Sequence, residues 1–435
     1  MCALRELSQG SPAVPAPLQC RGMVQSTATR SELHRRARAE LTENILPFWV
    51  RNAFDPLTGG LSGVVTNDLR RFDDVPRHVV LCARILWTFA AAARLDPRPE
   101  WLEIGRRAFA LLTGPFWDER HGGVYWSLEP DGRVHADRKQ IYAQAFAIYG
   151  LAEWHAATGD QEALARARTI FGLVEHHAAE PIYGGYLEAR SGAWAELADL
   201  RLSEKDLNAP KSMNTLLHVL EAYTRLFRVW PDAGLRSRLQ ALLGVMLDHV
   251  VTNKPYTHCQ LFFDLQWKSL SPVISFGHDI EASWLLWDAA EALGDASVLA
   301  RTRTVALDLA AGVLAHGRDS DGSIFYEGDQ ERVVKTDKHW WPQAEAVVGF
   351  LNAHALGGEE IYLAAAERTW QFIEDHVVDR KHGEWFAELD RSGRPLPDYP
   401  LHGGSCKVGP WKCPYHNARA CLEVMRRTAP RNCAT

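Results

Sequence analysis

The stretch FGHDIEASWLLWDAAEALGD, residues 276–295, has almost no polar face beyond its first turn. A helix that is apolar nearly all round lies inside a large protein, and Gly294 is the residue type that commonly ends a helix. The first turn nevertheless carries His278 and Glu281, whose spacing puts them on one side of the helix. Titratable groups at the start of a buried helix need a partner or a function. The stretch therefore predicts a buried helix that brings polar groups to an interior site.

Two kinds of helical segment alternate along the chain. Uniformly apolar segments predict buried inner helices, and they span residues 78–94, 139–156, 211–228, 278–293, 339–356 and 414–427. Segments that are amphipathic with the helical period predict outer helices at the surface, and they span residues 31–50, 100–114, 161–177, 233–250, 297–314 and 360–377. The pattern therefore gives six inner and six outer helices.

A turn recurs between these helices. Each copy has a glycine, then aromatic or β-branched residues, then usually Asp-Gly or Ser-Gly, which is typical of a short β-hairpin. Neighbouring copies lie roughly 60 residues apart, a period that indicates a closed or stacked array rather than separate domains. The copies span residues 54–70, 117–134, 182–194, 318–333 and 381–395, with a weaker copy at 259–272.

The simplest closure of this repeat is an all-α fold. We predict an (α/α)6 barrel of six inner and six outer helices, with the short β-hairpins at one end. An open helical solenoid is the alternative, but it requires polar capping repeats at both ends, and none is clear in the sequence.

The composition excludes several classes of protein. The 435 residues are 46% hydrophobic and 23% charged, as in globular proteins, and a net charge of −6 lacks the basic signature of nucleic-acid binding. No apolar run is long enough for a transmembrane helix, so we expect neither a nucleic-acid nor a membrane partner. The sixteen tryptophans fit either a helical core with large side chains or sugar binding.

The chain ends set the predicted domain boundaries. Residues 1–25 are rich in Ser, Pro and Gly and lack the apolar core of a secretory signal, so we predict a disordered tail. Residues 26–429 then form a single catalytic domain. The eight cysteines are scattered, which predicts reduced thiols and a cytoplasmic protein.

Polar residues occupy the interior of every predicted inner helix. Any one of them alone is more often structural, but burying six unsatisfied polar sites would cost several kcal/mol, so together they indicate a shared site. In chain order they are Arg84; Tyr142 and Gln144; Asn214 and His218; His278 and Glu281; Trp340, Trp341, Gln343 and Glu345; and Trp411, His416 and Asn417.

Two histidines across a cavity suit proton transfer at carbon, because imidazole titrates near neutrality and one ring can be basic while the other is protonated. Arg84, Tyr142 and Asn214 are suited to stabilising a developing oxyanion. We expect Glu281 to orient the His278 ring, one turn away.

Metal and nucleotide cofactors find little support in the sequence. His278 with Glu281, or Cys406 and Cys413 with His416, make only partial ligand sets, and a closed zinc site needs four. Phosphate-binding loops and the GxSxG nucleophile motif are missing from the sequence. We therefore predict no cofactor and no metal.

Four segments closely resemble the cellobiose 2-epimerases, which belong to the N-acylglucosamine 2-epimerase superfamily of (α/α)6 barrels. The resemblance extends over roughly residues 30 to 427, and its motifs are long and specific. It implies reversible, cofactor-free C2 epimerisation of the reducing-end glucose in β-1,4-linked disaccharides, from cellobiose to glucosyl-mannose and from lactose to epilactose. The segments are KSMNTLLHVLEAY (211–223), FGHDIEASWLL (276–286), KHWWPQAEAVVGFLNA (338–353) and WKCPYHNARACLE (411–423).

The resemblance also implies roles for individual residues. His278 and His416 match the acid–base pair on opposite faces of C2, and His218 matches a histidine that assists ring opening. Asp206 matches a residue that helps hold the substrate. The residues matching others around the sugar are Arg84, Tyr142, Asn214 and Glu281, and those matching aromatic platforms are Trp341 and Trp411.

Other functions remain open from the sequence. An N-acylglucosamine 2-epimerase or a mannose (aldose–ketose) isomerase would use the same barrel. A glycoside hydrolase would need two carboxyls flanking the scissile bond, from Asp206, Glu281 or Glu345, and would leave the histidines without a role. A sugar-binding protein without turnover is the third class. We expect a disaccharide as the partner of a monomer or homodimer.

Overall fold

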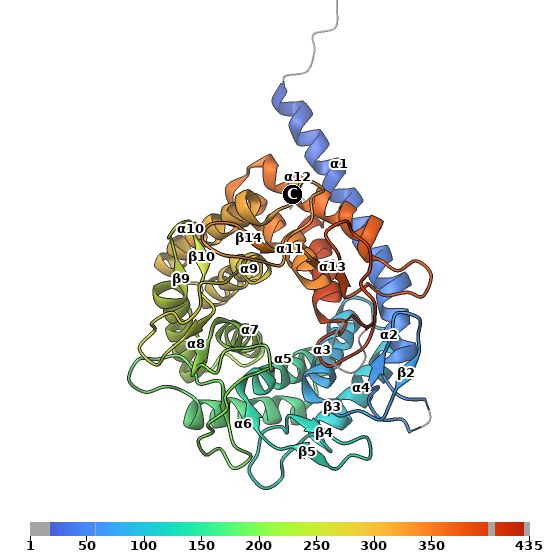
Figure 1. The fold of residues 1–435 in the computed structure, drawn as a ribbon, viewed down its shortest axis with the longest axis vertical. Coiled ribbons are helices and arrows are strands. Elements are labelled where there is room, and N and C mark those ends of the chain that lie inside the picture. The colour runs from blue at the N-terminus through green and yellow to red at the C-terminus, as the bar shows by residue number, and fades with distance from the viewer. Residues whose placement is uncertain (1–17, 57, 399–404, 430–435) are drawn as a thin grey trace, which may run out of the picture.

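The computed structural model describes residues 18–56, 58–398 and 405–429, with side chains from residue 28 onward. In this part of the chain, six inner helices form a ring and outer helices surround it (Figure 1). The inner helices are α3 (Val79–Leu95), α5 (Ile141–Thr158), α7 (Met213–Val229), α9 (Phe276–Leu293), α11 (Trp340–Gly357) and α13 (Tyr415–Thr428). Gly294, in the left-handed conformation, ends α9 as the sequence predicted.

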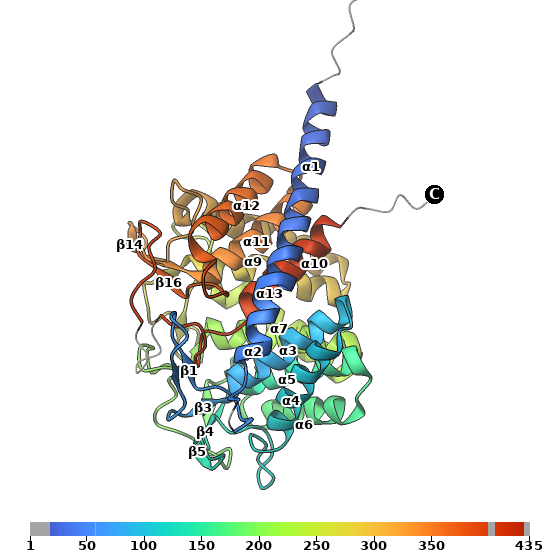
Figure 2. The same ribbon diagram turned by 90° about the vertical axis from the view of Figure 1, so that its right-hand side faces the viewer.

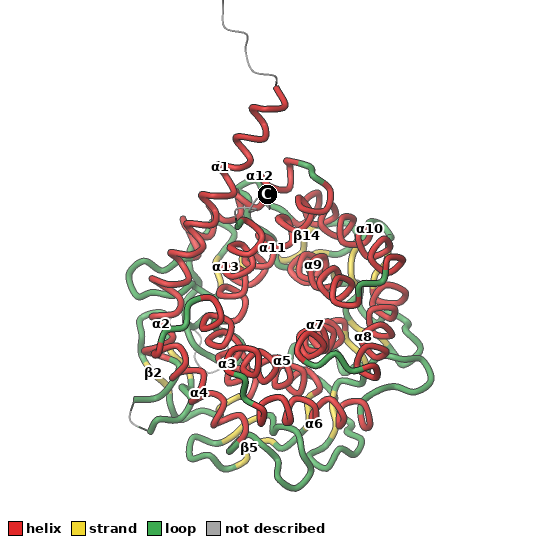
Figure 3. Tube along the Cα trace, turned by 180° about the vertical axis from the view of Figure 1, so that it is seen from behind, coloured by secondary structure: helices red, strands yellow, loops and turns green. Residues whose placement is uncertain are grey.

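Five outer helices alternate with the inner ones, and a rod of three consecutive elements completes the outer layer (Figure 3). Several end in a short π-helical turn. The outer elements are α1 (Leu18–Ala39), η1 (Glu40–Ile45) and α2 (Leu46–Asn52) in the rod; α4 (Pro99–Thr113); α6 (Gln161–His177); α8 (Ala233–Val245) with η2 (Met246–Val250); α10 (Ala296–Gly312) with η3 (Val313–Gly317); and α12 (Glu360–Phe372) with η4 (Ile373–Val377).

The ring of inner helices is closed. Each inner helix contacts the next in chain order, and α13 contacts α3 again. Backbone hydrogen bonds between Val65 and Val408 join the first hairpin to the segment before α13. The (α/α)6 barrel predicted from the repeat is therefore confirmed, and the open solenoid is excluded.

The strands are short and gather at one end of the barrel (Figure 2). A two-residue strand precedes each of α3, α5, α7, α9 and α11, and it pairs antiparallel with a strand of the following hairpin segment. The strands are β1 (Val64–Val65), β2 (Arg71–Phe72), β3 (Arg77–His78), β4 (Ser127–Leu128), β5 (Val134–Ala136), β6 (Lys139–Gln140), β7 (Ala189–Arg190), β8 (Lys211–Ser212), β9 (Val251–Thr252), β10 (His258–Cys259), β11 (Phe262–Phe263), β12 (Ile274–Ser275), β13 (Glu327–Gly328), β14 (Val333–Lys335), β15 (Lys338–His339) and β16 (Glu388–Leu389).

The start of α1 differs from the predicted boundary of the tail. Residues 18–25 were expected to be disordered, whereas α1 begins at Leu18. Neither glycine nor proline occurs between Gly22 and Pro47, so nothing in the sequence interrupts the helix there. The rest of the predicted tail, residues 1–17, lies outside the described residues. Among the helices that are described, none is long and apolar enough to cross a membrane.

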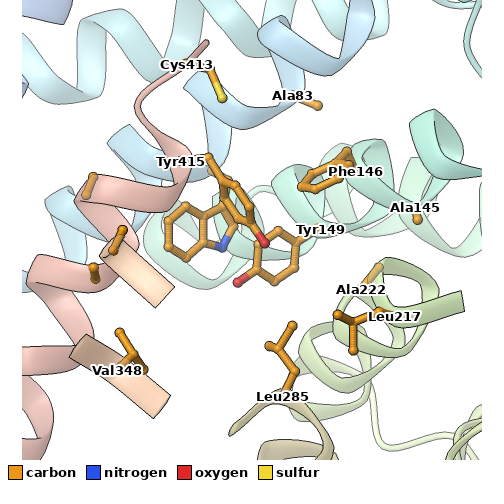
Figure 4. Close-up of a cluster of buried hydrophobic side chains, with 14 of the residues drawn as sticks. Ala83, Ala145, Phe146, Tyr149, Leu217, Ala222, Leu285, Val348, Cys413 and Tyr415 are labelled. Atoms are coloured by element: carbon orange, nitrogen blue, oxygen red, sulfur yellow. The ribbon is translucent and has the colours of Figure 1, made fainter. Parts of the chain in front are cut away.

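Aromatic rings fill the barrel below the hairpin end. Tyr149 and Tyr415 meet near the centre of the ring, and Phe146 lies beside them, with aliphatic side chains of α7, α9 and α11 around the cluster (Figure 4). The Trp87 ring stacks on Tyr149 at a centroid distance of 5.1 Å. These rings form a packed floor, so polar side chains at the starts of the inner helices are held on a rigid base.

Candidate active site

Two histidines stand in the first turns of two inner helices. In α9, Nδ1 of His278 lies 2.8 Å from Oγ of Ser275, the residue that caps the helix. In α13, Nδ1 of His416 lies 2.7 Å from Oε1 of Glu345 on α11. In each ring Nδ1 is engaged, which leaves Nε2 as the nitrogen that can act on a ligand.

The indole of Trp341 contacts both imidazoles. Its ring centroid lies 4.8 Å from that of His278 and 5.6 Å from that of His416. Burial lowers the pKa of His278 to about 3, with a further contribution from the nearby His218. Burial, with the positive charges of Arg84 and Arg419, also holds the pKa of His416 well below its usual value. Both rings are therefore neutral at pH 7, which differs from the expectation that one would be protonated.

A third histidine lies on α7, against the aromatic wall of α5. The His218 ring packs edge-on to Tyr142 at 5.1 Å, and its Nδ1 lies 2.9 Å from Oε2 of Glu221. The Tyr142 hydroxyl accepts a hydrogen bond of 2.6 Å from Arg84. The structure thus brings Arg84 and Tyr142 together with His218, whereas the sequence analysis grouped them with Asn214 and gave His218 a separate role in ring opening.

Glu281 does not orient His278, so that expectation is wrong. The Nδ1 of His278 contacts Ser275, whereas Glu281 accepts a hydrogen bond from Arg419 and lies 3.9 Å from Nδ1 of His416. The spacing of positions 278 and 281 puts both side chains on one face of α9, but each has a different partner there, Ser275 for His278 and Arg419 for Glu281. Burial and repulsion from Glu345 raise the pKa of Glu281 to about 7.

Arg419 links the carboxylates behind the histidines. Its Nη2 donates to Glu281 and, at 2.7 Å, to Glu345, and its Nη1 donates to Glu221. Sequence reasoning missed Arg419 and Glu221 as site residues, although each stands three residues after a predicted histidine, His416 and His218. That spacing, which places both groups on one helix face, was the available signal.

Two further predicted residues, Asp206 and Asn214, lie at a separate pocket. They line it together with Glu188, Ser212 and Phe262. Burial, with the negative charges of Glu327, Glu388 and, to a smaller extent, Asp206, raises the pKa of Tyr326. The Tyr326 ring in turn packs edge-on to Trp341 at 6.3 Å. Tyr326 therefore contacts Trp341, which lies at the histidine pair, and also senses the charge of Asp206 in the pocket.

Trp411 lies on the other side of the site. Its indole centroid is 6.2 Å from the ring of Tyr142 and 6.2 Å from that of Trp126. The thiol of Cys413, two residues on, is bound by Arg84 at 3.6 Å. The partial zinc set of Cys406, Cys413 and His416 is therefore not assembled as a ligand set, because Cys413 and His416 have different partners.

Neutral imidazoles can take and return protons, and the aromatic rings around them suit the apolar faces of a sugar. Together these features place the barrel in the class of carbohydrate isomerases. The family model of N-acylglucosamine 2-epimerase (GlcNAc 2-epimerase) matches residues 60–408. The chain belongs to this family, and it is a carbohydrate epimerase.

Individual relatives agree with this assignment. A cellobiose 2-epimerase of Bacteroides fragilis is 44% identical over 394 residues, which cover 90% of this chain and 98% of the relative. A cellobiose 2-epimerase of Ruminococcus albus is 36% identical over 392 residues, covering 90% and 97%. The solved structure of cellobiose 2-epimerase from Spirochaeta thermophila superposes with a TM-score of 0.82 at 40% identity, covering 95% of this chain and 99% of that one.

Proposed function

We propose that this enzyme interconverts the C2 epimers of β-1,4-linked disaccharides at their reducing-end glucose, turning cellobiose into glucosyl-mannose and lactose into epilactose. The observation that carries the proposal is the pair of imidazoles, His278 and His416, which both contact the indole of Trp341. Two neutral bases beside one aromatic platform can reach opposite faces of a carbon atom held between them. The named activity of the 44% identical relative supports the same reaction.

The proposed course begins with ring opening, assisted by His218. One of His278 and His416 then removes the C2 proton and leaves a cis-enediolate. Arg84 and Tyr142, joined by their hydrogen bond, and Asn214 supply donors for the developing negative charge. After rotation about the C2–C3 bond, the other histidine returns a proton to the opposite face and the ring closes.

Two aromatic platforms favour a disaccharide over a single sugar. Trp341 lies at the histidine pair, and Trp411 lies beside Tyr142 and Trp126. One indole is thus available for each ring of a two-sugar substrate, and Asp206 lines the adjoining pocket. N-acylglucosamine epimerisation and mannose isomerisation are the alternatives.

Hydrolysis is disfavoured by the state of the carboxylates. A hydrolase needs two carboxyls that flank the bond and face water or the glycosidic oxygen. Glu281 and Glu345 are buried, and both are bound to the same guanidinium nitrogen of Arg419. We further propose a cytoplasmic enzyme, monomeric or dimeric. The five cysteines whose side chains the structure describes are buried free thiols.

Incubation of cellobiose in deuterium oxide, with a chelator present, tests the function. We expect glucosyl-mannose that carries deuterium at C2, detected by NMR and mass spectrometry. Free glucose would instead indicate a hydrolase, and conversion of N-acetylglucosamine or mannose in preference to cellobiose would indicate one of the relatives. Loss of activity with the chelator would require a metal.

A further inference from the structure

The reaction needs an acid as well as a base, and burial favours the neutral form of both C2 histidines, which does not give up a ring proton readily. In the sugar-free molecule neither His278 nor His416 is an imidazolium at neutral pH. When one ring takes the C2 proton, the other must still have a proton to give. A neutral imidazole gives up its Nε2 proton readily only if its Nδ1 receives one at the same time. The group on Nδ1 therefore decides which ring can act as the acid.

The two rings differ at that position. The partner of His278 is the Ser275 hydroxyl, 2.8 Å away, and the partner of His416 is the Glu345 carboxyl, 2.7 Å away. A carboxyl exchanges a proton with imidazole far more readily than a hydroxyl does, because its pKa lies much closer to that of the ring. Among the described residues, His416 is thus the member of the pair whose Nδ1 contacts a carboxyl, a group that can give a proton to the ring and take one back.

The balance of charge around Arg419 favours a protonated carboxyl at Glu281 or Glu345. Glu221 is ionised, because Arg419, His218 and Tyr415 overcome the effect of burial and hold its pKa at about 2. Glu221 therefore neutralises the charge of Arg419, and the same guanidinium cannot fully compensate Glu281 and Glu345 as well. Burial raises the pKa of Glu345, and burial with repulsion from Glu345 raises that of Glu281 to about 7. Oε2 of Glu281 has no hydrogen-bond partner in the described part of the chain.

Other titratable groups face this cluster from the five inner helices other than α11, which carries Glu345. They are Arg84 on α3, Tyr142 and Tyr149 on α5, His218 and Glu221 on α7, His278 on α9, and Tyr415 and Arg419 on α13. The tyrosines have pKa values raised by burial and stay neutral. The two carboxyls whose pKa values are raised, Glu281 and Glu345, are therefore the groups that can hold a proton beside His416.

We propose that Glu345 is the proton partner of His416 in epimerisation. As Nε2 of His416 gives its proton to C2, Nδ1 takes a proton from the Glu345 carboxyl; in the reverse direction Nε2 takes the C2 proton and Nδ1 returns one to Glu345. His278 gains the proton that Glu345 loses, so protons balance and no redox change occurs. Glu345 acts through His416 and is a positioning residue, and Arg419, anchored by Glu221, holds its carboxyl in place. This inference rests on the proposed function.

The substitution Glu345→Gln separates proton removal from inversion. For the epimer whose C2 proton faces His278, removal of that proton should continue, but the opposite face receives no proton. Incubation with each epimer separately in deuterium oxide should give, for one of them, starting sugar with deuterium at C2 and an epimerisation rate reduced by about 100-fold or more. Parallel loss of exchange and inversion for both epimers, or full epimerisation, would overturn the proposal.

Glu40→Gln is the matched control. Glu40 is also a buried carboxyl bound to an indole, that of Trp385 at 2.7 Å, as Glu345 is bound to Trp284 at 3.0 Å, but it lies on η1 outside the site. This variant should keep the wild-type ratio of inversion to exchange. The same ratio change in Glu40→Gln and Glu345→Gln would refute a specific role for Glu345.

The variant Glu281→Gln tests the same proposal if Glu345→Gln fails to fold. Glu281→Gln keeps an acceptor for Arg419 but removes a negative charge next to Glu345, so it should lower the pKa of the Glu345 carboxyl and move the alkaline limb of the kcat profile to lower pH. An unmoved limb would count against the proposal. Failure of the proposed function looks different, because the wild-type enzyme would then neither exchange nor invert C2 of cellobiose.

Discussion

The partner of Nδ1 gives each of the three histidines a different chemistry. Ser275 fixes the orientation of His278 without changing its charge, Glu345 offers His416 an exchangeable proton, and Glu221 is an ionised carboxylate beside His218. The contact with Glu221 occupies Nδ1 of His218, which leaves Nε2 as the nitrogen that would meet the sugar ring oxygen in the proposed ring opening. In the proposed mechanism, three identical side chains would thus take different parts of the reaction because the partner of Nδ1 differs in each.

Replacing either member of the C2 pair should stop the reaction. We expect His278→Asn and His416→Asn each to lower epimerisation of cellobiose by about 100-fold or more, because asparagine cannot take or give the proton. The helical circular dichroism spectrum should stay unchanged. Substantial epimerase activity in either variant would remove that histidine from the chemistry.

Asp279 supplies a prediction about stability and pH. Its buried carboxyl accepts the backbone N–H of Cys259 at 2.7 Å, and burial raises its pKa to about 8 from the usual 3.8. The folded state binds this proton more tightly than the unfolded state, so the free energy of unfolding falls as pH rises from about 4 to about 8. In Asp279→Asn the side chain does not ionise, so its contribution to the free energy of unfolding no longer falls as pH rises.

We therefore expect Asp279→Asn to be more stable than the wild type at pH 9, by about 1–3 kcal/mol, and to gain least at pH 4. Thermal unfolding followed by circular dichroism at both pH values measures the difference. An equal change at the two pH values would show that Asp279 is ionised in the folded protein.

At the scale of the element, a buried ion pair holds most hairpins to the helix that follows. Four lysines with fully buried side chains bind a carboxylate in the preceding turn. Three of them lie in the short strand that leads to an inner helix, and the fourth lies next to Val408, which bridges to Val65 before α13. The pairs are Lys139 with Asp118, Lys211 with Glu180, Lys338 with Asp319 and Lys407 with Asp379, at 2.7 to 3.4 Å. These contacts fix the hairpin end, where the site lies.

Breaking one such pair should be costly. Asp118→Asn keeps the hydrogen-bond acceptor for the turn but leaves the Lys139 ammonium buried without its charge partner, which should destabilise the fold by about 3 kcal/mol. The double variant Asp118→Asn with Lys139→Met should recover much of the loss, because no unpaired charge remains.

The exposed pair of Arg133 and Asp131 is the control. Its side chains are 79% and 55% exposed, so Asp131→Asn should leave the midpoint of thermal unfolding unchanged. A loss in Asp118→Asn no larger than that in Asp131→Asn would show that the buried pair contributes nothing specific.

The sequence predicts these elements unevenly. Inner and outer helices were predicted correctly because burial on all sides and burial on one side leave different periodic patterns. The hairpins were predicted from their turn residues, but their pairing was not: β3, for example, pairs with β4 across the whole of α3 and α4. Such partners depend on how the repeats stack, which no local pattern records. For the same reason the resemblance identified His278 and His416, whereas Ser275 and Glu345 became visible as their partners only in three dimensions.

At the scale of the whole molecule, the closed ring of six inner helices brings residues from distant parts of the chain together at the candidate site. Arg84 on α3 and Cys413 before α13 are in contact although 329 residues separate them, and Tyr415 on α13 binds Glu221 on α7. The floor of Tyr149, Tyr415 and Phe146 in Figure 4 joins helices from both ends of the chain. The spacing between neighbouring inner helices therefore sets the width of the barrel and the positions of all site residues together.

That spacing depends on a glycine in α5. A Cβ at Gly150 would lie 2.8 Å from the carbonyl oxygen of Ala83 on α3, next to Arg84, whereas a Cβ at Gly172 on the outer helix α6 meets nothing within 4 Å. Alanine favours helix at both positions, so propensity alone predicts that Gly172→Ala and Gly150→Ala each gain up to about 1 kcal/mol. At Gly150, overpacking should reverse the sign and cost about 1–3 kcal/mol.

Because Gly150→Ala pushes α3 away from α5, it should also disturb the hydrogen bond between Arg84 and Tyr142 and raise KM for cellobiose, while Gly172→Ala leaves KM unchanged. Chemical unfolding and epimerisation kinetics of the two variants measure both effects. Equal stability gains would mean that the inner helices can separate without cost. The ring would then not be the rigid frame that holds two imidazoles at one carbon.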